Sequence, residues 1–415
     1  MSQTVNYPLP VVGIDMLSSE TSMPNGAVRS AVNVDIERNG VFSRRAGYEQ
    51  RIHMPGLHSL YYAAQSDIIL VADNDQLCTV DHDLQTLTWL TALGSPDPVS
   101  YTEYNGNIYY ANKTTTGWIP SGRYGVCSLG LPTPTPPSRL EEAPGGLLPG
   151  VYAVAISMFD SLGEESGLSA VKIIDLPVGG GIRLYGLPVE PGYSLGIYIT
   201  PPDGDRLICA SAPPAAFPVY DIVEYPRGAP ARTQFLEPLP PGDIIRWHNG
   251  RLFVASGSNL FFSEALRPHL HRPGHSAIPF RGDITMVESV GSGIFVGDER
   301  GVWFLRGGDP NDFNQQLVSP TPVVAGSSLV LPAEYFPEQQ TRTEGLCAVW
   351  LCSDGYAIGT SAGNTLEPQR ERIRIPNGLH GKSAFLMRKG RKQVITLVDK
   401  APTAVGEVAT DSTIP

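Results

Sequence analysis

Apolar and polar residues alternate in short runs along most of this chain. Residues 103–119 and 247–264 carry one shared pattern, in which Asn-Gly precedes an apolar run that ends in alanine. Asn-Gly is the strongest short signal for a β-hairpin turn, because both residues accept positive φ at little cost. Aligning turn, apolar run and small residue predicts five copies, with the small residue at Ala72, Ala111, Ala255, Gly297 and Gly359. A second short run follows in several copies, so each unit is predicted to be turn, strand, turn, strand.

The spacing of the copies predicts a β-propeller. Ala72 and Ala111 are 39 positions apart, and Ala255 and Gly297 are 42 apart. A period of about 40 residues built from strands is typical of propeller blades. The step from Gly297 to Gly359 is longer by a Pro-containing segment, Pro320 to Gln339. The step from Ala111 to Ala255 is one period plus roughly 104 residues, which indicates an inserted domain.

The two chain ends are predicted to close the ring. Residues 31–49 form one expected hairpin about Asn39-Gly40, and residues 383–399 form another about Lys389-Gly390. Together they supply four strands, and a blade shared by both termini removes the exposed sheet edge of an open ring. Five internal blades and this shared blade make six. Five or seven stay open, because the segment from Pro320 to Gln339 has room for an irregular blade.

The inserted segment is predicted to be a separate β-sandwich. Pro-rich stretches at 132–138 (PTPTPPS) and 237–243 (EPLPPGD) frame it as stiff joints. Seven short candidate strands lie between them, at 151–158, 170–176, 182–186, 193–200, 206–212, 219–223 and 232–236. A hundred residues with this strand count fit an immunoglobulin-like or fibronectin-type sandwich, and the missing Cys-Trp-Cys framework favours the fibronectin type. The expected divisions are 1–131 (propeller), 132–240 (sandwich), 241–402 (propeller) and 403–415 (tail).

Composition agrees with an all-β fold and excludes several classes. Apolar residues make up 41 % of 415, and Gly (44) and Pro (38) are abundant, as many tight turns require. No run approaches the ~18 apolar residues of a membrane span, and the N-terminus lacks a secretory pattern, so we expect synthesis in the cytoplasm and no membrane insertion. The five cysteines are odd in number and scattered, so we expect all to be reduced. A net charge of −11 argues against a surface that coats nucleic acid.

Two sequence motifs match known catalytic or metal-binding patterns, but the residues around them do not support such a site. Gly359-Thr360-Ser361-Ala362-Gly363 matches a G-x-S-x-G nucleophile elbow, but that motif requires a helix next, and a loop and strand are expected here. His269, His271 and His275 offer an H-x-H pair with a third nitrogen nearby. No acidic partner for these rings is evident in the sequence, so a plain surface loop is favoured over a metal site.

Three further motifs are interpreted as turns. Asp73-Asn74-Asp75 lacks the glycine and closing glutamate of a calcium loop. Arg281-Gly282-Asp283 resembles an adhesion tripeptide, and Gly179–Gly181 lacks the strand and helix of a phosphate loop. We therefore assign no catalytic, cofactor-binding or metal-binding residue, and predict that the protein is not an enzyme.

Three segments carry a resemblance to a known group of proteins. GAVRSAVNVDIERNGVFSRRAGYEQ (26–50) resembles the opening of structural proteins from tailed bacteriophage virions, with Ala46 where proline is more usual. YAVAISMFDSLGEESGLS (152–169) looks like the fibronectin-like module often inserted in them, and GVWFLRGGDPNDFN (301–314) resembles one of their blades. The resemblance implies a nozzle, hub or baseplate-side protein without catalysis, located in the virion tail.

The partners that this resemblance implies are other tail proteins and further copies of the chain. An acidic surface would also let DNA slide past in a tail channel, because it repels phosphates. The alternative function is a receptor- or glycan-binding propeller at the host-facing end, with a host receptor as partner. Its candidate residues are aromatic: Tyr61, Tyr62, Tyr104, Tyr109 and Trp118. Packing within strands is the plainer explanation of these five side chains.

Overall fold

The computed structural model describes residues 13–36, 42–45, 47, 49–122, 125–336, 344–376, 379–388 and 391–400. Across these residues the structure consists of β-strands, turns and two short 3-10 segments, η1 (Pro310–Asp312) and η2 (Ala333–Tyr335). The all-β fold class is therefore confirmed. No helix in this part of the chain is long and apolar enough to span a membrane.

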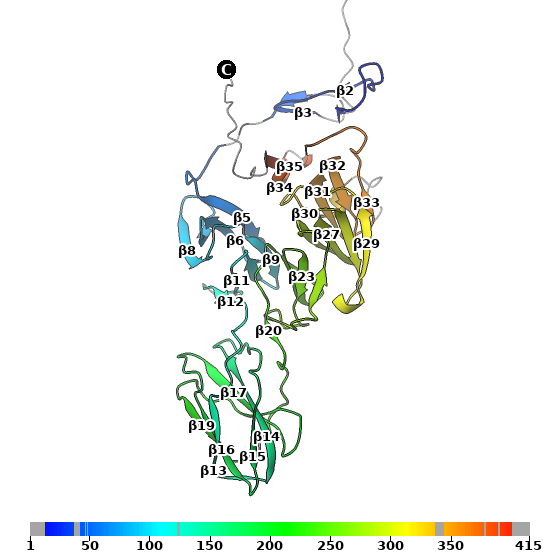
Figure 1. Cartoon of the computed structure of the whole chain (residues 1–415). Coiled ribbons are helices and arrows are strands. Elements are labelled where there is room, and N and C mark those ends of the chain that lie inside the picture. Colours follow the sequence, from blue (N-terminus) through cyan, green and yellow to red (C-terminus); the bar gives the residue numbers. More distant parts are fainter. Residues whose placement is uncertain are drawn as a thin grey trace, which may run out of the picture. The chain divides into compact units, whose positions relative to one another are not determined.

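The described chain falls into two compact units. One comprises the described parts of Met1–Pro55, His82–Thr86 and Phe280–Pro415, and the other comprises Gly56–Asp81 and Leu87–Pro279. We call them unit 1 and unit 2 and describe each by itself. Figure 1 labels their elements.

Outside the inserted segment, the described part of unit 2 contains three four-stranded antiparallel sheets that follow one another along the chain. In each, strands consecutive in the sequence are hydrogen-bonded neighbours. The one exception is in the third sheet, where a short strand that pairs elsewhere precedes the last strand of the sheet. The first sheet is β5 (Leu57–Ala63), β6 (Ile68–Asp73), β7 (Gln76–Val80) and β8 (Leu87–Ala92). The second is β9 (Ser100–Tyr104), β10 (Asn107–Ala111), β11 (Thr116–Ile119) and β12 (Cys127–Ser128). The third is β21 (Ile244–His248), β22 (Arg251–Ser256), β23 (Asn259–Phe262) and β25 (Ala277–Pro279).

Unit 1 contains two more sheets of the same design and several short pairs. The fourth sheet is β26 (Met286–Val290), β27 (Gly293–Asp298), β28 (Gly301–Arg306) and β29 (Asn314–Ser319). The fifth is β30 (Leu329–Pro332), β31 (Leu346–Cys352), β32 (Gly355–Gly359) and β33 (Thr365–Leu366). The two-stranded pairs are β1 (Gly13–Ile14) with β2 (Ala27–Val28), β3 (Val34–Ile36) with β4 (Phe42–Arg44), and β34 (Leu379–Arg388) with β35 (Arg391–Lys400).

The two Asn-Gly pairs are hairpin turns, as the sequence predicts. Asn105 and Gly106 have φ of 51° and 74°, and Asn249 and Gly250 have 44° and 79°. Positive φ at both central residues is the geometry of a type I′ turn, whose twist matches the flanking strands. The turns join β9 to β10 and β21 to β22, so each repeat begins at the same point of its sheet.

Four of the five predicted repeat copies occupy equivalent strands. Ala72, Ala111, Ala255 and Gly297 lie on β6, β10, β22 and β27, each the second strand of its sheet. The fifth assignment is wrong, because Gly359 lies on β32, the third strand of its sheet. The equivalent strand is β31, which has no glycine or alanine at its end. The alignment therefore placed the fifth copy one strand too late.

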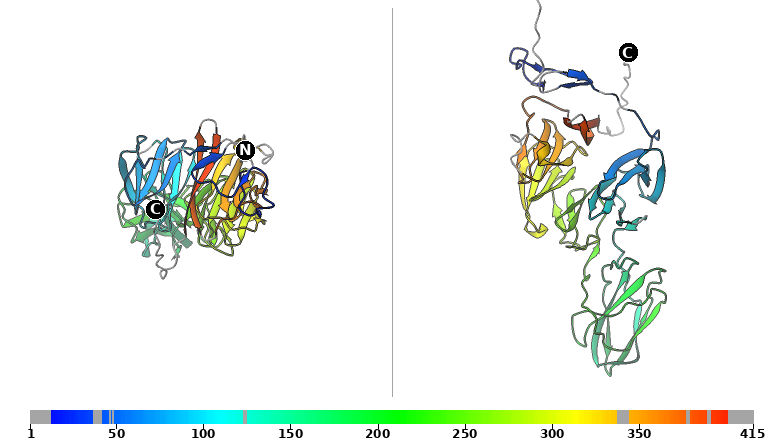
Figure 2. Two further views of the ribbon diagram at one scale, coloured as in Figure 1. Left: turned by 90° about the horizontal axis from the view of Figure 1, so that it is seen from above. Right: turned by 180° about the vertical axis from the view of Figure 1, so that it is seen from behind.

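The inserted segment is a two-sheet sandwich of seven strands. One sheet has the order β13-β16-β19 and the other β15-β14-β17-β18. The strands are β13 (Arg139–Leu147), β14 (Gly150–Phe159), β15 (Lys172–Leu176), β16 (Gly180–Tyr185), β17 (Ser194–Ile199), β18 (Ile208–Ser211) and β19 (Val219–Ile222). Its buried core is largely aliphatic and includes Ile156, Ile182, Leu184 and Ile197. Figure 2 shows this sandwich as a lobe distinct from the three sheets of its own unit.

Two details of the sandwich differ from expectation. Residues 232–236, predicted as a strand, form a turn in which Phe235 has a φ of 62°. The missing seventh strand is β13, whose sequence RLEEAPGGL contains proline and two glycines. It lies at the edge of its sheet, where a proline is tolerated because one side of the strand needs no ladder.

The two terminal hairpins form separate two-stranded sheets. Within the described residues β3 pairs with β4 and β34 with β35, and His380 of β34 adds one isolated parallel bridge to Ala325. Their predicted turns, Asn39-Gly40 and Lys389-Gly390, lie outside the described residues, as does the tail at 403–415. Leu386 and Leu397 are exposed on the C-terminal hairpin.

Candidate functional site

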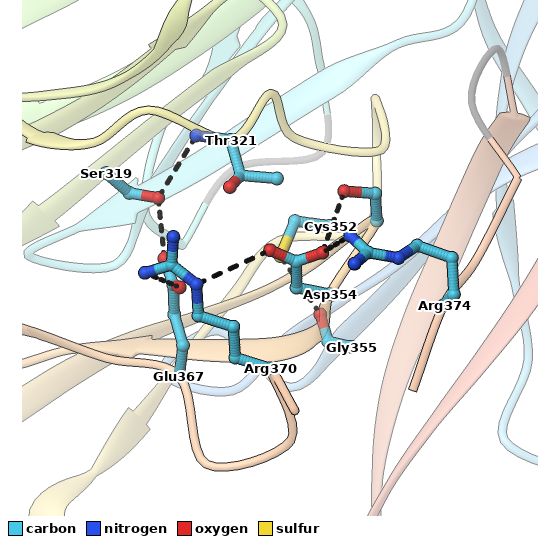
Figure 3. A network of polar contacts seen from close by, with 9 residues as sticks. Ser319, Thr321, Cys352, Asp354, Gly355, Glu367, Arg370 and Arg374 are labelled. Atoms are coloured by element: carbon cyan, nitrogen blue, oxygen red, sulfur yellow. Dashed lines mark hydrogen bonds and ion pairs between the residues drawn. The ribbon is translucent and has the colours of Figure 1, made fainter. Parts of the chain in front are cut away.

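The most connected polar cluster of unit 1 surrounds two nearly buried carboxylates. Asp354 lies in the turn between β31 and β32, and its side chain is 8 % exposed. It accepts hydrogen bonds from Arg374 and from the Ser353 hydroxyl, and the Nε of Arg370 lies 3.8 Å from its Oδ2. Figure 3 shows that Arg370 and Arg374 approach Asp354 from opposite sides.

The second carboxylate of this cluster is Glu367, whose side chain is 10 % exposed. Its Oε1 accepts the Ser319 hydroxyl at 2.7 Å, and its Oε2 lies 3.4 Å from Nη1 of Arg370 (Figure 3). Arg370 thus bridges both carboxylates. Nearby cations and hydrogen-bond donors stabilise buried carboxylates, and here Oε2 of Glu367 has the ion pair with Arg370 but no hydrogen bond among the described residues.

The cluster fixes the segment that leads from β33 to β34. The Ile375 N–H donates to the Ser353 carbonyl at 2.7 Å, and the Tyr356 N–H donates to Oε1 of Gln369 at 2.9 Å. The Met16 N–H donates to the Arg372 carbonyl at 2.7 Å. Each carboxylate is therefore occupied by partners of its own chain, and the arrangement holds the peptide in place.

Ser361 does not lie in a nucleophile elbow. It follows β32 in a turn that leads to β33, so strand, turn and strand replace the strand, turn and helix of the motif. Its hydroxyl donates to the Glu344 carbonyl at 2.8 Å. The serine therefore closes a loop contact.

The three candidate histidines face different partners. Nε2 of His269 lies 3.2 Å from the Glu165 carbonyl, and Nδ1 of His271 lies 3.2 Å from the Glu237 carbonyl. His275 is exposed in a turn. Among the described residues, no group of three His, Cys, Asp or Glu side chains is placed to hold a metal ion.

The remaining sequence motifs lie in turns or at strand ends. Asp73 ends β6, and Asn74 has a φ of 51° in the tight turn to β7. Arg281-Gly282-Asp283 is a bend that precedes β26. Gly179 and Gly180 both have positive φ and lead into β16, a strand rather than a helix. All five cysteines are free thiols.

The five candidate aromatic residues divide into packed and exposed groups. Tyr109 is buried, and Trp118 packs near it at 6.0 Å between ring centroids. Tyr61 stacks on Tyr101 at 5.0 Å. Tyr62 is 55 % exposed and donates its hydroxyl to Asp67, and Tyr104 is 37 % exposed.

Tyr104 belongs to a stack that the sequence does not reveal. Its ring lies 4.0 Å from that of Trp247 with 13° between the planes, and Trp247 lies 5.8 Å from Tyr109. Trp247 is on β21, and the other two rings are on β9 and β10. The stack therefore joins the second sheet to the third, with one edge open to solvent.

Sequence reasoning also missed a contact between an acid and an imidazole. Oε1 of Glu164 lies 3.5 Å from Nδ1 of His269, and these side chains are only 18 % and 10 % exposed. Burial, and then the negative charge of Asp160, raises the pKa of Glu164 to about 7. Burial lowers the pKa of His269. More than a hundred residues separate the two in sequence, so no local signal could have paired them.

Comparison with known proteins gives no family. No family model matches the chain, and no curated protein matches it. Among solved structures, BBS1N in complex with ARL6DN has a TM-score of 0.32 at 11% identity, covering 83% of this chain and 89% of that one. YCF48 from Cyanidioschyzon merolae has 0.30 at 8% identity, covering 84% and 97%. Saccharomyces cerevisiae Sqt1 has 0.24 at 9%, covering 77% and 84%. These TM-scores are too low to argue for a shared fold, so the architecture rests on the sheets themselves.

Proposed function

We propose that the protein is a structural component of a bacteriophage tail that works through protein–protein contacts. The observation that carries the proposal is the recurrence of one design. Five four-stranded antiparallel sheets follow one another along the chain, and a separate sandwich interrupts them between the second and the third. Repeated sheets of this kind build propellers, which offer rigid loop faces for assembly. The resemblance of residues 26–50 to virion proteins supports the assignment to a tail.

The fold belonging to this function is a propeller of about six blades with a fibronectin-like insertion. Its parts are 1–131, 132–240 and 241–402, with a tail at 403–415. The terminal hairpins are proposed to complete the closing blade. Unit 1 exposes Leu386, Met387 and Leu397 on its C-terminal hairpin, and unit 2 exposes Leu60 and Trp89 on its first sheet. These side chains are the proposed contact points with other tail proteins.

The polar cluster around Asp354 and the contact made by Ser361 support a non-catalytic role. Asp354 and Glu367 are engaged by arginines of their own chain, and the Ser361 hydroxyl is engaged by a carbonyl. A catalytic propeller brings acids, bases or metal ligands from several blades to one point. The network around Asp354 joins the loop after β33 to the fifth sheet and, through Ser319 of β29, to the fourth, and its acids are paired with arginines.

The test is mass spectrometry of purified phage particles. We expect this chain in intact, washed virions at a fixed stoichiometry that matches the symmetry of the tail. Capsids that lack tails, purified from the same lysate, are the control and should lack it. Absence of the protein from complete particles would contradict the proposal.

A second candidate function is receptor or glycan binding, and the stack of Tyr104 on Trp247 favours it. Aromatic side chains commonly line ligand sites, and Tyr104 is partly exposed in this stack. Tyr104→Ala should then abolish binding to host cell-wall glycans, whereas Tyr225→Ala, at an exposed tyrosine outside the five candidates, should not. Equal binding by both variants and the parent would exclude this stack as the receptor site.

A further inference from the structure

The sandwich touches the sheets of its own unit through the contact between Glu164 and His269. Glu164 lies in the loop between β14 and β15 of the sandwich. His269 immediately precedes β24 (Leu270–His271), which pairs with β20 (Glu237–Pro238) where the chain leaves the sandwich. The same loop also donates the Leu168 N–H to the Thr233 carbonyl at 3.1 Å. This joint is therefore built from two loops and a short strand pair.

The hydrogen-bond geometry fixes the protonation of the imidazole. Nε2 of His269 lies 3.2 Å from the Glu165 carbonyl, which can only accept, so Nε2 carries a hydrogen. In the neutral ring Nδ1 then presents a lone pair, and it faces Oε1 of Glu164 at 3.5 Å. An ionised Glu164 would place two lone pairs opposite each other. One proton between these two atoms, on the carboxyl or on the ring, makes the contact attractive.

We propose that Glu164 and His269 form a proton-dependent latch that holds the sandwich to the sheets of its unit. The latch is closed while one proton lies between the two side chains, and it loosens when that proton is lost. This inference goes beyond the proposed function and does not depend on it, because the latch acts whatever partner the sandwich contacts.

The neighbouring charged groups are accounted for on every side. Asp160, in the same loop, accepts the N–H groups of Leu162 and Glu164. The carboxylate of Glu165 is held by the hydroxyls of Ser157 and Tyr198. Arg267 lies near His269 and donates to the Arg232 carbonyl, and Tyr109 of β10 is close enough to Glu164 to feel its charge. None of the four supplies a second proton to the contact.

The direction of the pH effect follows from the carboxyl. Its pKa is raised from 4.5 to about 7, so the folded joint retains a proton that an unfolded chain releases. A raised folded-state pKa means that the stabilisation is present at low pH and is lost as the pH rises through about 7. In more acidic solution a second proton would charge the ring of His269. Because the pKa of His269 is lowered, this happens only at a pH below its ordinary range. The latch therefore holds in weakly acidic solution and weakens above neutrality.

Hydrogen exchange of the full chain at about pH 6 and about pH 8.5 tests the latch, after correction for the intrinsic pH dependence of exchange. The peptides to follow cover residues 160–169 and 267–271. We expect their opening to increase roughly tenfold per pH unit as the pH rises from 4.5 towards about 7 and then to level off, which gives roughly tenfold in all between the two conditions. Glu164→Gln should abolish this dependence, because its amide donates to Nδ1 without titrating. Asp175→Asn, at an exposed acid on β15 of the same sandwich, should keep it.

Nitrogen NMR of the imidazole of His269 gives an independent reading that needs no variant. We expect the tautomer with hydrogen on Nε2 and a chemical-shift change near pH 7 that follows Glu164. Three results would overturn the latch: exchange that does not change with pH, the same dependence in Glu164→Gln, or hydrogen on Nδ1 in the neutral ring. None of them would bear on the tail assignment, which the particle composition decides.

Discussion

Gly117 shows how one missing side chain supports a sheet. It lies on β11 directly opposite Tyr110 of β10, and the tyrosine ring lies across it. A Cβ at Gly117 would clash with the hydroxyl and ring of Tyr110. Tyr110 is itself among the largest fully buried side chains, so its ring has no free space to move into.

Gly117→Ala should therefore lower the free energy of unfolding by about 1–3 kcal/mol, the usual cost of overpacking a core. Thermal or urea denaturation of the full chain measures it. Gly125→Ala, near the same sheet, is the matched control, because no heavy atom lies within 4 Å of its added Cβ. Equal stability of the two variants would show that the ring of Tyr110 can shift.

Single residues in the sequence predict turns better than they predict contacts. The turns at Asn105-Gly106 and Asn249-Gly250 can be predicted because their conformation depends on the turn residues alone. The role of Glu164 cannot, because its raised pKa and its contact with His269 arise only once the sandwich packs beside the third sheet. The need for glycine at position 117 is likewise not predictable, because it follows from the strand register that places Gly117 opposite Tyr110.

The C-terminal hairpin is attached to the fifth sheet by a chain of hydroxyl groups. The Tyr356 hydroxyl on β32 lies 2.7 Å from that of Thr396 on β35, which lies 2.7 Å from that of Ser383 on β34. Ser383 donates in turn to the Ser327 carbonyl at 2.5 Å. Tyr335 of η2 stacks on Phe385 of β34 at 4.8 Å and adds an apolar contact.

Tyr356→Phe removes one end of this chain while preserving the ring. We expect a loss of about 1 kcal/mol and faster hydrogen exchange in residues 379–388 and 391–398. Tyr225→Phe, at an exposed tyrosine of the other unit, should leave these peptides unchanged. A hairpin that exchanges at the parent rate in Tyr356→Phe would show that the apolar contacts hold it alone.

Most strands are visible in the pattern of apolar runs, and two of the failures have clear physical causes. β13 was missed because an edge strand needs few apolar residues and accepts Pro144, Gly145 and Gly146. The fifth repeat was assigned to the wrong strand because β31 and β32 are both apolar and are joined by a tight turn at Ser353 and Asp354, where Asp354-Gly355 is itself a strong hairpin signal. The local sequence pattern identifies a hairpin but does not show which strands of the sheet the hairpin joins.

At the scale of the whole molecule, the sandwich has a core of its own. Its main buried cluster contains only residues from 147 to 222, including Tyr152, Leu176, Leu195 and Ile199. The three sheets of the same unit bury other clusters, around Leu70 and Tyr110 and around Ile245 and Val254. A domain with a separate core is expected to fold by itself.

Residues 137–238, expressed alone, should therefore give one cooperative thermal transition with a β-sheet circular dichroism spectrum. A fragment ending at residue 200, which lacks β18 and β19, is the control and should not melt cooperatively. Absence of a cooperative transition in the 137–238 fragment would mean that the sandwich depends on the sheets around it.

The insertion point also constrains the order in which the chain can fold. The Trp247 N–H donates to the Thr102 hydroxyl at 3.2 Å across a sequence separation of 145 residues. Closing so long a loop of unfolded chain costs conformational entropy that grows with its length. A sandwich that has already folded brings its two ends together and reduces this cost. Non-local contacts set folding rates, so we expect the sandwich to be structured before the second sheet meets the third, and slow assembly in any variant whose sandwich is unfolded.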